Sequence, residues 1–128
     1  MRLLLDTHAL IWWAADIGQL SARARDAIEN GENEVFASAI SAMEIATKVR
    51  IGKLEEGRPL ATDFMDQIRA CGLQPLALTA GHGQLAGSLT IAHKDPFDRM
   101  LIAQAMIENM TFVSNERIFD AFGVIRLW

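Results

Sequence analysis

Residues 3–10 read Leu-Leu-Leu-Asp-Thr-His-Ala-Leu, and this stretch decides the fold. The three leucines form a short apolar run of the kind that marks a buried strand, and the run stops at Asp6. An apolar segment at residues 9–15 follows almost at once and favours a helix. A short buried strand that leads straight into a helix predicts an α/β unit.

The same alternation of short apolar runs and longer helical stretches continues to the end of the chain. It predicts further strands at residues 34–37, 74–78, 111–114 and 124–127. It predicts further helices at residues 21–29, 41–51, 60–70, 80–87, 96–109 and 116–122, the first two capped by Ser21 and Ser41. Pro96 opens the most apolar of these helices, which should therefore be central. The pattern predicts an α/β fold with a central parallel sheet.

Length and composition predict a single domain covering residues 1–128. The chain is too short for two full cores, and its 51% of apolar residues can fill one. Cys71 is the single cysteine, which excludes an internal disulfide and a cysteine-based zinc site. The longest apolar run, residues 9–15, is far shorter than the roughly 20 residues of a membrane span, and Asp6 comes too early for a secretory signal. We therefore expect a cytoplasmic protein with no membrane partner.

The formal net charge of −4 counts against a nucleic-acid partner, because most nucleic-acid-binding domains are basic. The objection weakens if several of the acids gather in one metal site, where a bound divalent ion reverses the local sign. It also weakens if a basic partner protein covers the acidic face. Charge alone therefore leaves both classes of function open.

Four acids occupy comparable places in the predicted fold. Asp6 follows the first strand, and Glu116 follows the fourth. Glu44 and Asp98 lie in the first turns of the helices that begin near residues 41 and 96. In an open parallel sheet, ligands bind beyond the carboxyl ends of the strands, and strand ends and the starts of the following helices all face that edge. We therefore expect the four side chains to converge within one pocket.

Converging carboxylates repel one another, and burying them without a cation is costly. Mg²⁺ resolves the conflict, because it prefers oxygen ligands, keeps several waters and shares the phosphate oxygens of a substrate. Such a site can activate water for in-line attack on a phosphodiester without a protein nucleophile. The acids therefore predict metal-dependent hydrolysis of phosphodiesters.

Each acid also has a purely structural interpretation. Asp6 fits a helix N-cap, and Glu44 fits an acid that complements a helix dipole. Asp98 could pair with a neighbouring cation on a solvated face, and Glu116 opens a short helix, where acids are common. The joint pattern carries more weight than its members, because chance rarely puts four acids at one edge of a sheet.

Residues beside these acids have two interpretations as well. Thr7 and Ser114 could hydrogen-bond a ligand carboxylate, or they could satisfy local backbone groups. Asp95 is predicted to cap the helix that starts at Pro96, with an outer acid of the site as the alternative. Arg99 and Lys94 could meet substrate phosphates or pair with Asp98.

Three blocks of the sequence resemble the signature blocks of PIN-domain toxins of the VapC type. They are LLLDTHAL at residues 3–10, SAMEI at residues 41–45 and HKDPFDRMLIAQA at residues 93–105. The closing FVSNE at residues 112–116 and RLW at residues 126–128 resemble the ending of the same group. The resemblance covers nearly the whole chain.

The resemblance implies a three-layer α/β/α sandwich with strand order 3-2-1-4-5 and a single PIN domain. It implies an endoribonuclease dependent on Mg²⁺ or Mn²⁺, which hydrolyses RNA with metal-activated water. It implies the toxin role in a type II toxin–antitoxin pair, with a VapB-type antitoxin, homodimers and larger assemblies. Asp6, Glu44 and Asp98 match the core acids of the family. Glu116 falls where the family more often has Asp, so its longer side chain is either a ligand through water or no ligand.

The aromatic and histidine residues near the first strand fit supporting roles. His8 and His93 are expected to be structural or to contact ligands rather than to bind metal themselves. Trp12 and Trp13 are adjacent and cannot share one face of a helix. We expect one of them in the core and the other at a dimer or antitoxin surface.

Two other functions compete with the ribonuclease. A PIN fold could bind RNA or a partner without cleavage, and the acidic net charge and Glu116 favour this alternative. A phospho-receiver or a haloacid-dehalogenase-like phosphatase also uses a central Asp. The receiver needs an Asp after the third strand, where the sequence has Thr79. The phosphatase needs an Asp two residues after Asp6, where the sequence has His8.

Overall fold

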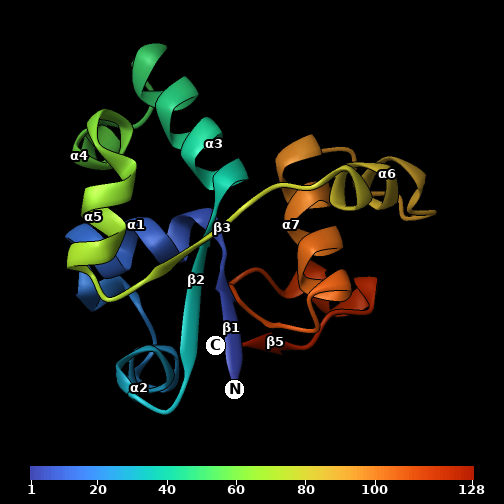
Figure 1. The fold of residues 1–128 in the computed structure, drawn as a ribbon, viewed down its shortest axis with the longest axis horizontal. Coiled ribbons are helices and arrows are strands. Elements are labelled where there is room, and N and C mark those ends of the chain that lie inside the picture. Colours follow the sequence, from blue (N-terminus) through green and yellow to red (C-terminus); the bar gives the residue numbers. More distant parts are fainter.

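Five parallel strands form the centre of the molecule, which Figure 1 shows as a computed structural model describing all residues, 1–128. The strands are β1 (Arg2–Leu5), β2 (Glu34–Ser38), β3 (Gln74–Leu76), β4 (Thr111–Val113) and β5 (Arg126–Leu127). They lie in the order β3-β2-β1-β4-β5, and every neighbouring pair is parallel. The predicted sheet and its strand order are confirmed.

Helices cover both faces of this sheet and make three layers (Figure 1). One side carries α1 (Thr7–Ala15), α2 (Ala22–Glu29), α4 (Arg58–Thr62) and α5 (Phe64–Ala70). The other side carries α7 (Pro96–Ile107), with α6 (Ala80–Ser88) packed against it. The remaining helix, α3 (Ala39–Arg50), continues from the end of β2 beyond the carboxyl edge of the sheet. None of the helices combines the length and apolar character needed to span a membrane.

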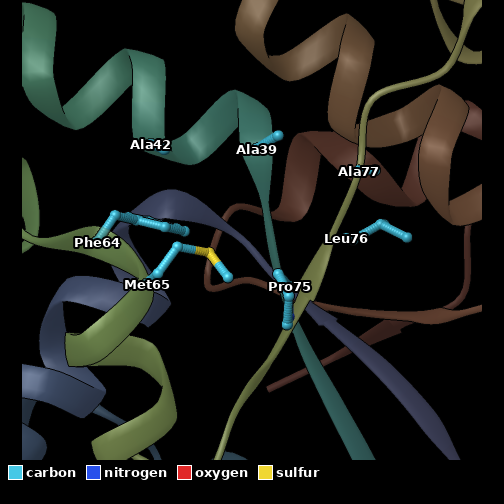
Figure 2. Close-up of a pocket in the computed structure, with 7 residues that line it drawn as sticks. All are labelled: Ala39, Ala42, Phe64, Met65, Pro75, Leu76 and Ala77. Carbon is cyan, nitrogen blue, oxygen red and sulfur yellow. The ribbon is translucent and has the colours of Figure 1, made fainter.

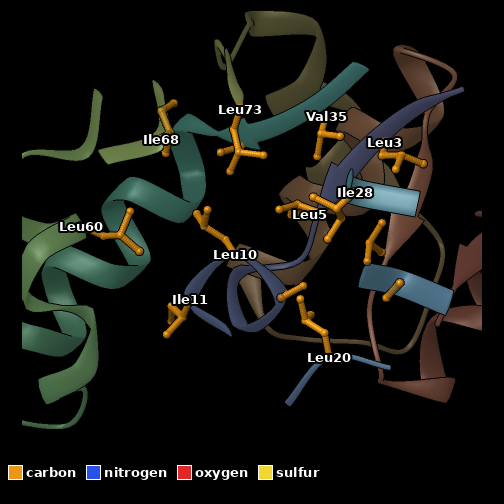
Figure 3. Close-up of a cluster of buried hydrophobic side chains, with 14 of the residues drawn as sticks. Leu3, Leu5, Leu10, Ile11, Leu20, Ile28, Val35, Leu60, Ile68 and Leu73 are labelled. Carbon is orange, nitrogen blue, oxygen red and sulfur yellow. The ribbon is translucent and has the colours of Figure 1, made fainter. Parts of the chain in front are cut away.

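The leucine run of β1 holds the layers together because successive side chains of a strand point to opposite faces. Leu3 and Leu5 belong to the apolar cluster under α1 and α2, which also contains Leu10 and Ile28 (Figure 3). Leu4 belongs to the cluster under α7. All three leucines are fully buried, and each contributes roughly 1.5–3 kcal/mol relative to an exposed position.

The start of α3 differs from the prediction. The predicted cap was Ser41, but α3 begins at Ala39, and Ser38 is the residue that caps it. Ser38 is the last residue of β2, and its hydroxyl accepts a hydrogen bond from the Ile40 N–H at 3.0 Å. Ser41 is fully buried in the first turn of the helix. Either serine is a residue type suited to a helix cap. Ser38 is the cap because β2 pairs with β3 as far as Ser38, and the helix begins directly after it.

The region predicted as one helix at residues 60–70 is divided into α4 and α5. Asp63 lies between them with φ −149° and ψ 72°, outside the helical region. A 3₁₀ helix, η2 (Glu55–Gly57), precedes α4, which begins at Arg58, two residues before the predicted start. Pro59 fits the first turn because its missing N–H has no partner there in any case.

The remaining elements differ from the prediction mainly at their ends. β3 and β5 are shorter than predicted. The predicted helix at residues 116–122 is a 3₁₀ helix, η3 (Arg117–Phe122), and another, η1 (Ile17–Gln19), follows α1. Pro75 lies in β3 at the edge of the sheet, where a strand tolerates a residue without an N–H.

Candidate active site

Asp6 lies at the centre of the carboxyl edge of the sheet. It follows β1 directly, and its N–H donates to the Val113 carbonyl at 2.9 Å. Asp6 is also the N-cap of α1, because its Oδ1 accepts from the Thr7 N–H at 2.8 Å. Its second oxygen, Oδ2, accepts from the Ser114 hydroxyl at 2.8 Å. The structural interpretation of Asp6 as a cap therefore holds, and the carboxylate is 4% exposed.

Glu44 reaches the same edge from α3. It lies in the second turn of α3 rather than the predicted first, because the helix starts earlier than predicted. The Thr7 hydroxyl donates to Glu44 Oε1 at 2.7 Å, and Ser41 Oγ lies 2.9 Å from Thr7 Oγ1. Lys48, one turn further along α3, donates to Glu44 Oε2 at 2.5 Å. Thr7 thus links Asp6 to Glu44 through its N–H and its hydroxyl.

Asp98 lies in the first turn of α7, as predicted. Its partner is His93, whose Nε2 lies 2.7 Å from Asp98 Oδ2. The His93 ring packs beside Phe119 and Phe122, with ring centroids 5.9 and 5.4 Å apart. The suggested pairing of Asp98 with Arg99 or Lys94 does not occur, because His93 holds the carboxylate instead.

Glu116 adds negative charge to this edge. Its side chain is exposed, and its backbone N–H donates to Ser114 Oγ at 3.1 Å. The charge on Glu116 contributes to the raised pKa of both Asp6 and Asp98. Ser114 therefore joins Asp6 and Glu116, since its hydroxyl donates to one and accepts from the backbone of the other.

The Asp6 carboxyl has a strongly raised pKa. Burial raises the pKa of Asp6 from 3.8 to about 7, against the hydrogen bond from Ser114, and the charges on Asp98 and Glu116 raise it further. Burial also raises the pKa of Asp98, and the His93 hydrogen bond opposes this shift. Asp6, Asp98 and Glu116 therefore repel one another, which a cation at this edge would relieve.

Lys48 brings a cation to these acids that sequence reasoning missed. Burial lowers the pKa of Lys48, but the hydrogen bond and charge of Glu44, with the charges of Asp95 and Asp98, raise it overall. The available signal was the spacing of Glu44 and Lys48, which puts them on one face of a helix. Ser41, a buried residue of α3 whose hydroxyl contacts that of Thr7, carried no signal that set it apart from a cap.

The four acids share one edge but do not close into the tight pocket that the sequence predicted. No three carboxylate, imidazole or thiol side chains lie close enough together to enclose one metal ion. Ser114 donates to Asp6, Lys48 donates to Glu44, and His93 contacts Asp98. Carboxylates repel one another unless a cation lies between them. In this structure each of the three carboxylates is instead stabilised by a hydrogen-bond partner from the protein.

The residues next to Asp98 are only partly placed as predicted. Asp95 is the N-cap of α7, because its Oδ1 accepts from the N–H groups of Phe97 (2.8 Å) and Asp98 (3.2 Å). Lys94 is exposed. Arg99 was suggested to meet substrate phosphates, but its guanidinium donates to backbone carbonyls of the segment before α7. Four of its five N–H donors are used in this way, so its contact with substrate phosphates stays a prediction that only one donor could serve.

Both tryptophans are partly buried against the apolar core, so neither is the fully buried core residue that was predicted. The dimer or antitoxin surface stays a prediction. Trp13 Nε1 donates to the Cys71 carbonyl at 3.0 Å. Trp12 packs between His8 and Trp128, with ring centroids 5.6 and 5.8 Å away. His8 is exposed and lies beside Trp12, and its structural role stays a prediction.

The largest cavity, of about 410 Å³, has no acid in its lining and is unsuited to hydrolysis. Figure 2 shows it between the start of α3, α5 and the end of β3. Its lining residues are Ala39, Ala42, Phe64, Met65, Pro75, Leu76 and Ala77. None of these side chains can donate or accept a proton, so the acidic edge remains the candidate site.

Removing the Ser114 hydroxyl tests the electrostatics of this edge. In Ser114→Ala, we expect the pKa of Asp6 to rise above 7, because the variant loses the hydrogen bond that favours the charged carboxylate. Carbon-detected NMR titration of the Asp6 carboxyl in metal-free protein measures the change. Ser88→Ala, at an exposed position of α6, is the control and should leave the titration of Asp6 as it is. A lower or unchanged pKa in Ser114→Ala would contradict the assignment.

Comparison with known protein families gives a match over nearly the whole chain. The family model described as "PIN domain" matches residues 3–125. Ribonuclease VapC22 of Mycobacterium tuberculosis is 29% identical over 117 residues, which cover 89% of this chain and 86% of that protein. Ribonuclease VapC16 of the same organism is 38% identical over 58 residues, 45% of this chain and 41% of that protein.

Solved structures share the fold at low sequence identity. VapBC2 from Rickettsia felis, crystallised with a DNA fragment from its promoter, has a TM-score of 0.68 at 18% identity, covering 99% of this chain and 98% of that one. FitAcB from Neisseria gonorrhoeae has a TM-score of 0.64 at 15% identity, covering 98% and 96%. VapBC-1 from nontypeable Haemophilus influenzae has a TM-score of 0.57 at 13% identity, covering 99% and 97%.

Proposed function

Because this chain belongs to the PIN domain family and is a homologue of VapC-type ribonuclease toxins, we propose that it is a metal-dependent endoribonuclease. Its proposed substrate is RNA, and the proposed reaction is hydrolysis, in which a water oxygen bonds to phosphorus and one P–O ester bond breaks. The proposed site is the acidic edge formed by Asp6, Glu44 and Asp98.

One observation supports this proposal most strongly. Asp6 is buried with a pKa raised to about 7. The charges of Asp98 and Glu116 make the ionised form of Asp6 still less favourable. A buried carboxylate beside two more acids is unfavourable unless a cation accompanies it. The donor set of carboxylates and hydroxyls suits hard cations such as Mg²⁺, with Mn²⁺ as the alternative.

Each residue of the edge has a proposed part. Asp6, Glu44 and Asp98 would hold the metal, which has to draw them closer together than they lie in the metal-free structure. Thr7 and Ser114 would orient the carboxylates of Glu44 and Asp6. When bound, the divalent ion would lower the pKa of a water molecule and steady the leaving oxygen. Lys48 would compete with the ion for Glu44 Oε2, which its ammonium now occupies. Glu116 is exposed and is proposed as an outer acid or a ligand through water.

The direct test is cleavage of total RNA by the purified protein. We expect discrete cuts with Mg²⁺ or Mn²⁺ and none with EDTA, and sequencing of the RNA ends maps the cut sites. Asp98→Asn, purified in the same way, controls for contaminating nucleases. RNA that stays intact at every metal concentration would count against a nuclease.

A toxin role with a VapB-type antitoxin is the accompanying proposal. The names of two solved relatives indicate VapBC pairs, and the net charge of −4 would suit a basic partner segment. A short gene beside this one that encodes a small protein should yield a complex on co-expression. Size-exclusion chromatography of that complex would also report the proposed homodimer or larger assembly.

The second candidate is a PIN fold that binds RNA or a partner without cleavage. The contact between Lys48 and Glu44 favours it, because a protein cation already neutralises one acid. Calorimetric titration with Mg²⁺ separates the two candidates. Binding that is lost in Asp98→Asn supports the nuclease, and the absence of binding supports the second candidate.

A further inference from the structure

Arg99 makes an unusual set of hydrogen bonds for an arginine next to a proposed active site. Its Nε donates to the Ala86 carbonyl at 2.8 Å, and its Nη2 donates to the Leu89 carbonyl at 2.6 Å. Its Nη1 donates to the carbonyls of Ile91 (3.3 Å) and His93 (2.8 Å). All four acceptors are backbone oxygens from the end of α6 and the segment that follows it. A guanidinium has five N–H donors, so little of Arg99 remains for an anion.

The segment that Arg99 binds has no regular structure of its own. Residues 89–95 connect α6 to α7 without a helix or a strand. Backbone carbonyls in such a connection need partners from elsewhere, and here one side chain from α7 supplies them. Arg99 therefore ties the whole connection to the helix that carries Asp98.

His93, near the end of the connection, touches the acidic edge. Arg99 donates to the carbonyl of His93, and the His93 ring contacts Asp98 at 2.7 Å. The rings of Phe119 and Phe122 flank the His93 ring, whereas Arg99 holds the backbone carbonyl of His93. The position of the His93 imidazole thus depends on the carbonyls that Arg99 holds.

We propose that Arg99 is a positioning residue that fixes the connection between α6 and α7, so that His93 orients the carboxylate of Asp98. The inference rests on the proposed function, because it gives Asp98 a ligand role. Partners that orient a ligating carboxylate typically change metal affinity or activity by about 10- to 100-fold when they are lost.

Lysine is a poor substitute in this geometry. Four carbonyls surround a planar fork of donors, whereas an ammonium is a point charge with three N–H groups on a flexible chain. Arg99→Lys keeps the positive charge and most of the aliphatic stem, but it cannot reach all four oxygens. A role that depended on charge alone would survive this substitution, and the proposed role would not.

The experiment compares Arg99→Ala and Arg99→Lys with Arg23→Ala, a control at an exposed position of α2. Hydrogen–deuterium exchange of metal-free protein should show faster exchange in residues 89–94 of both Arg99 variants. Calorimetry with Mn²⁺ should show about 10- to 100-fold weaker binding. RNA cleavage should show a similar fall in kcat with KM changed by less than about threefold, because the proposed role gives Arg99 no contact with the substrate.

Coupling to His93 gives the sharpest readout. His93→Phe keeps an aromatic ring between Phe119 and Phe122 but loses the contact with Asp98. If Arg99 acts through His93, adding Arg99→Lys to His93→Phe should weaken Mn²⁺ binding by less than about threefold further, although Arg99→Lys alone weakens it at least about tenfold. Millimolar guanidinium ion should restore part of the Mn²⁺ affinity of Arg99→Ala. It should leave the Mn²⁺ affinity of the Arg23→Ala control unchanged.

The outcomes separate this inference from the proposed function. Normal metal affinity and kcat in a folded Arg99→Lys protein, or additive effects with His93→Phe, would overturn the role of Arg99 and leave the nuclease intact. If wild-type protein bound no Mn²⁺, the proposed function would fail, and Arg99 would have no ligand to position. If Arg99→Ala does not fold, Arg99→Lys and the double variant decide the question.

Discussion

Asp98→Asn and Asp6→Asn should each reduce RNA cleavage by more than about 100-fold while the fold stays intact. Residues that only orient a metal ligand change activity by about 10- to 100-fold, so loss of a ligand itself should exceed that range. Asparagine keeps the size of the side chain and one acceptor oxygen, so the cap that Asp6 provides to Thr7 can persist. Cleavage of a mapped RNA fragment under single-turnover conditions measures the loss.

Two controls keep this result interpretable. Circular dichroism and urea unfolding show whether each variant is folded. Asp26→Asn, at an exposed position of α2, changes the net charge by the same amount and should cleave like the wild type. Cleavage at the wild-type rate in a folded Asp6→Asn or Asp98→Asn protein would remove these residues from the proposed site.

Metal-free protein should lose stability as the pH rises from about 4 to about 7, and Asp6→Asn should remove much of this loss. The pKa of Asp6 is 3.8 when unperturbed and about 7 in the folded protein. A carboxyl with a raised pKa binds its proton more tightly when folded, so folding is favoured at low pH and disfavoured once the carboxyl ionises. The contribution reaches at most about 4 kcal/mol, because one pKa unit corresponds to about 1.4 kcal/mol.

Urea unfolding in EDTA at several pH values tests this prediction. The free energy of unfolding of Asp6→Asn minus that of wild type should grow from near zero at pH 4 to its largest value above pH 7. Mg²⁺ should narrow the difference at pH 8, because binding to the folded state stabilises the wild type. Parallel pH profiles of the two proteins would show that ionisation of Asp6 does not cause the loss of stability.

The predicted stability gain also bears on function. A residue whose removal stabilises the metal-free fold lowers the stability of the protein. Such destabilising residues are concentrated at functional sites. Asp6 would then differ from an ordinary N-cap, whose replacement normally destabilises a helix by about 1 kcal/mol. The sign of the change in Asp6→Asn therefore separates the two interpretations of this acid.

The sequence by itself determined the sheet. Leu3, Leu4 and Leu5 predicted a strand buried on both sides, and all three are fully buried between two layers of helices. The alternation of strands and helices predicted a parallel sheet, and the resemblance implied its order. These features could be predicted because the spacing of apolar residues along the sequence indicates which side chains are buried in each strand and helix.

Only the tertiary structure decided which polar groups meet. The partners of Asp6, Glu44 and Asp98 include Ser114 from the far end of the chain and His93 from an irregular connection. Arg99 follows Asp98 directly, yet its guanidinium points to the carbonyls before α7. Hydrogen bonds depend on distances of a few tenths of an ångström and on direction, whereas apolar burial tolerates many arrangements of similar volume. A linear pattern therefore predicts which acids share an edge, but the three-dimensional packing of distant segments sets the hydrogen-bond partners of each acid.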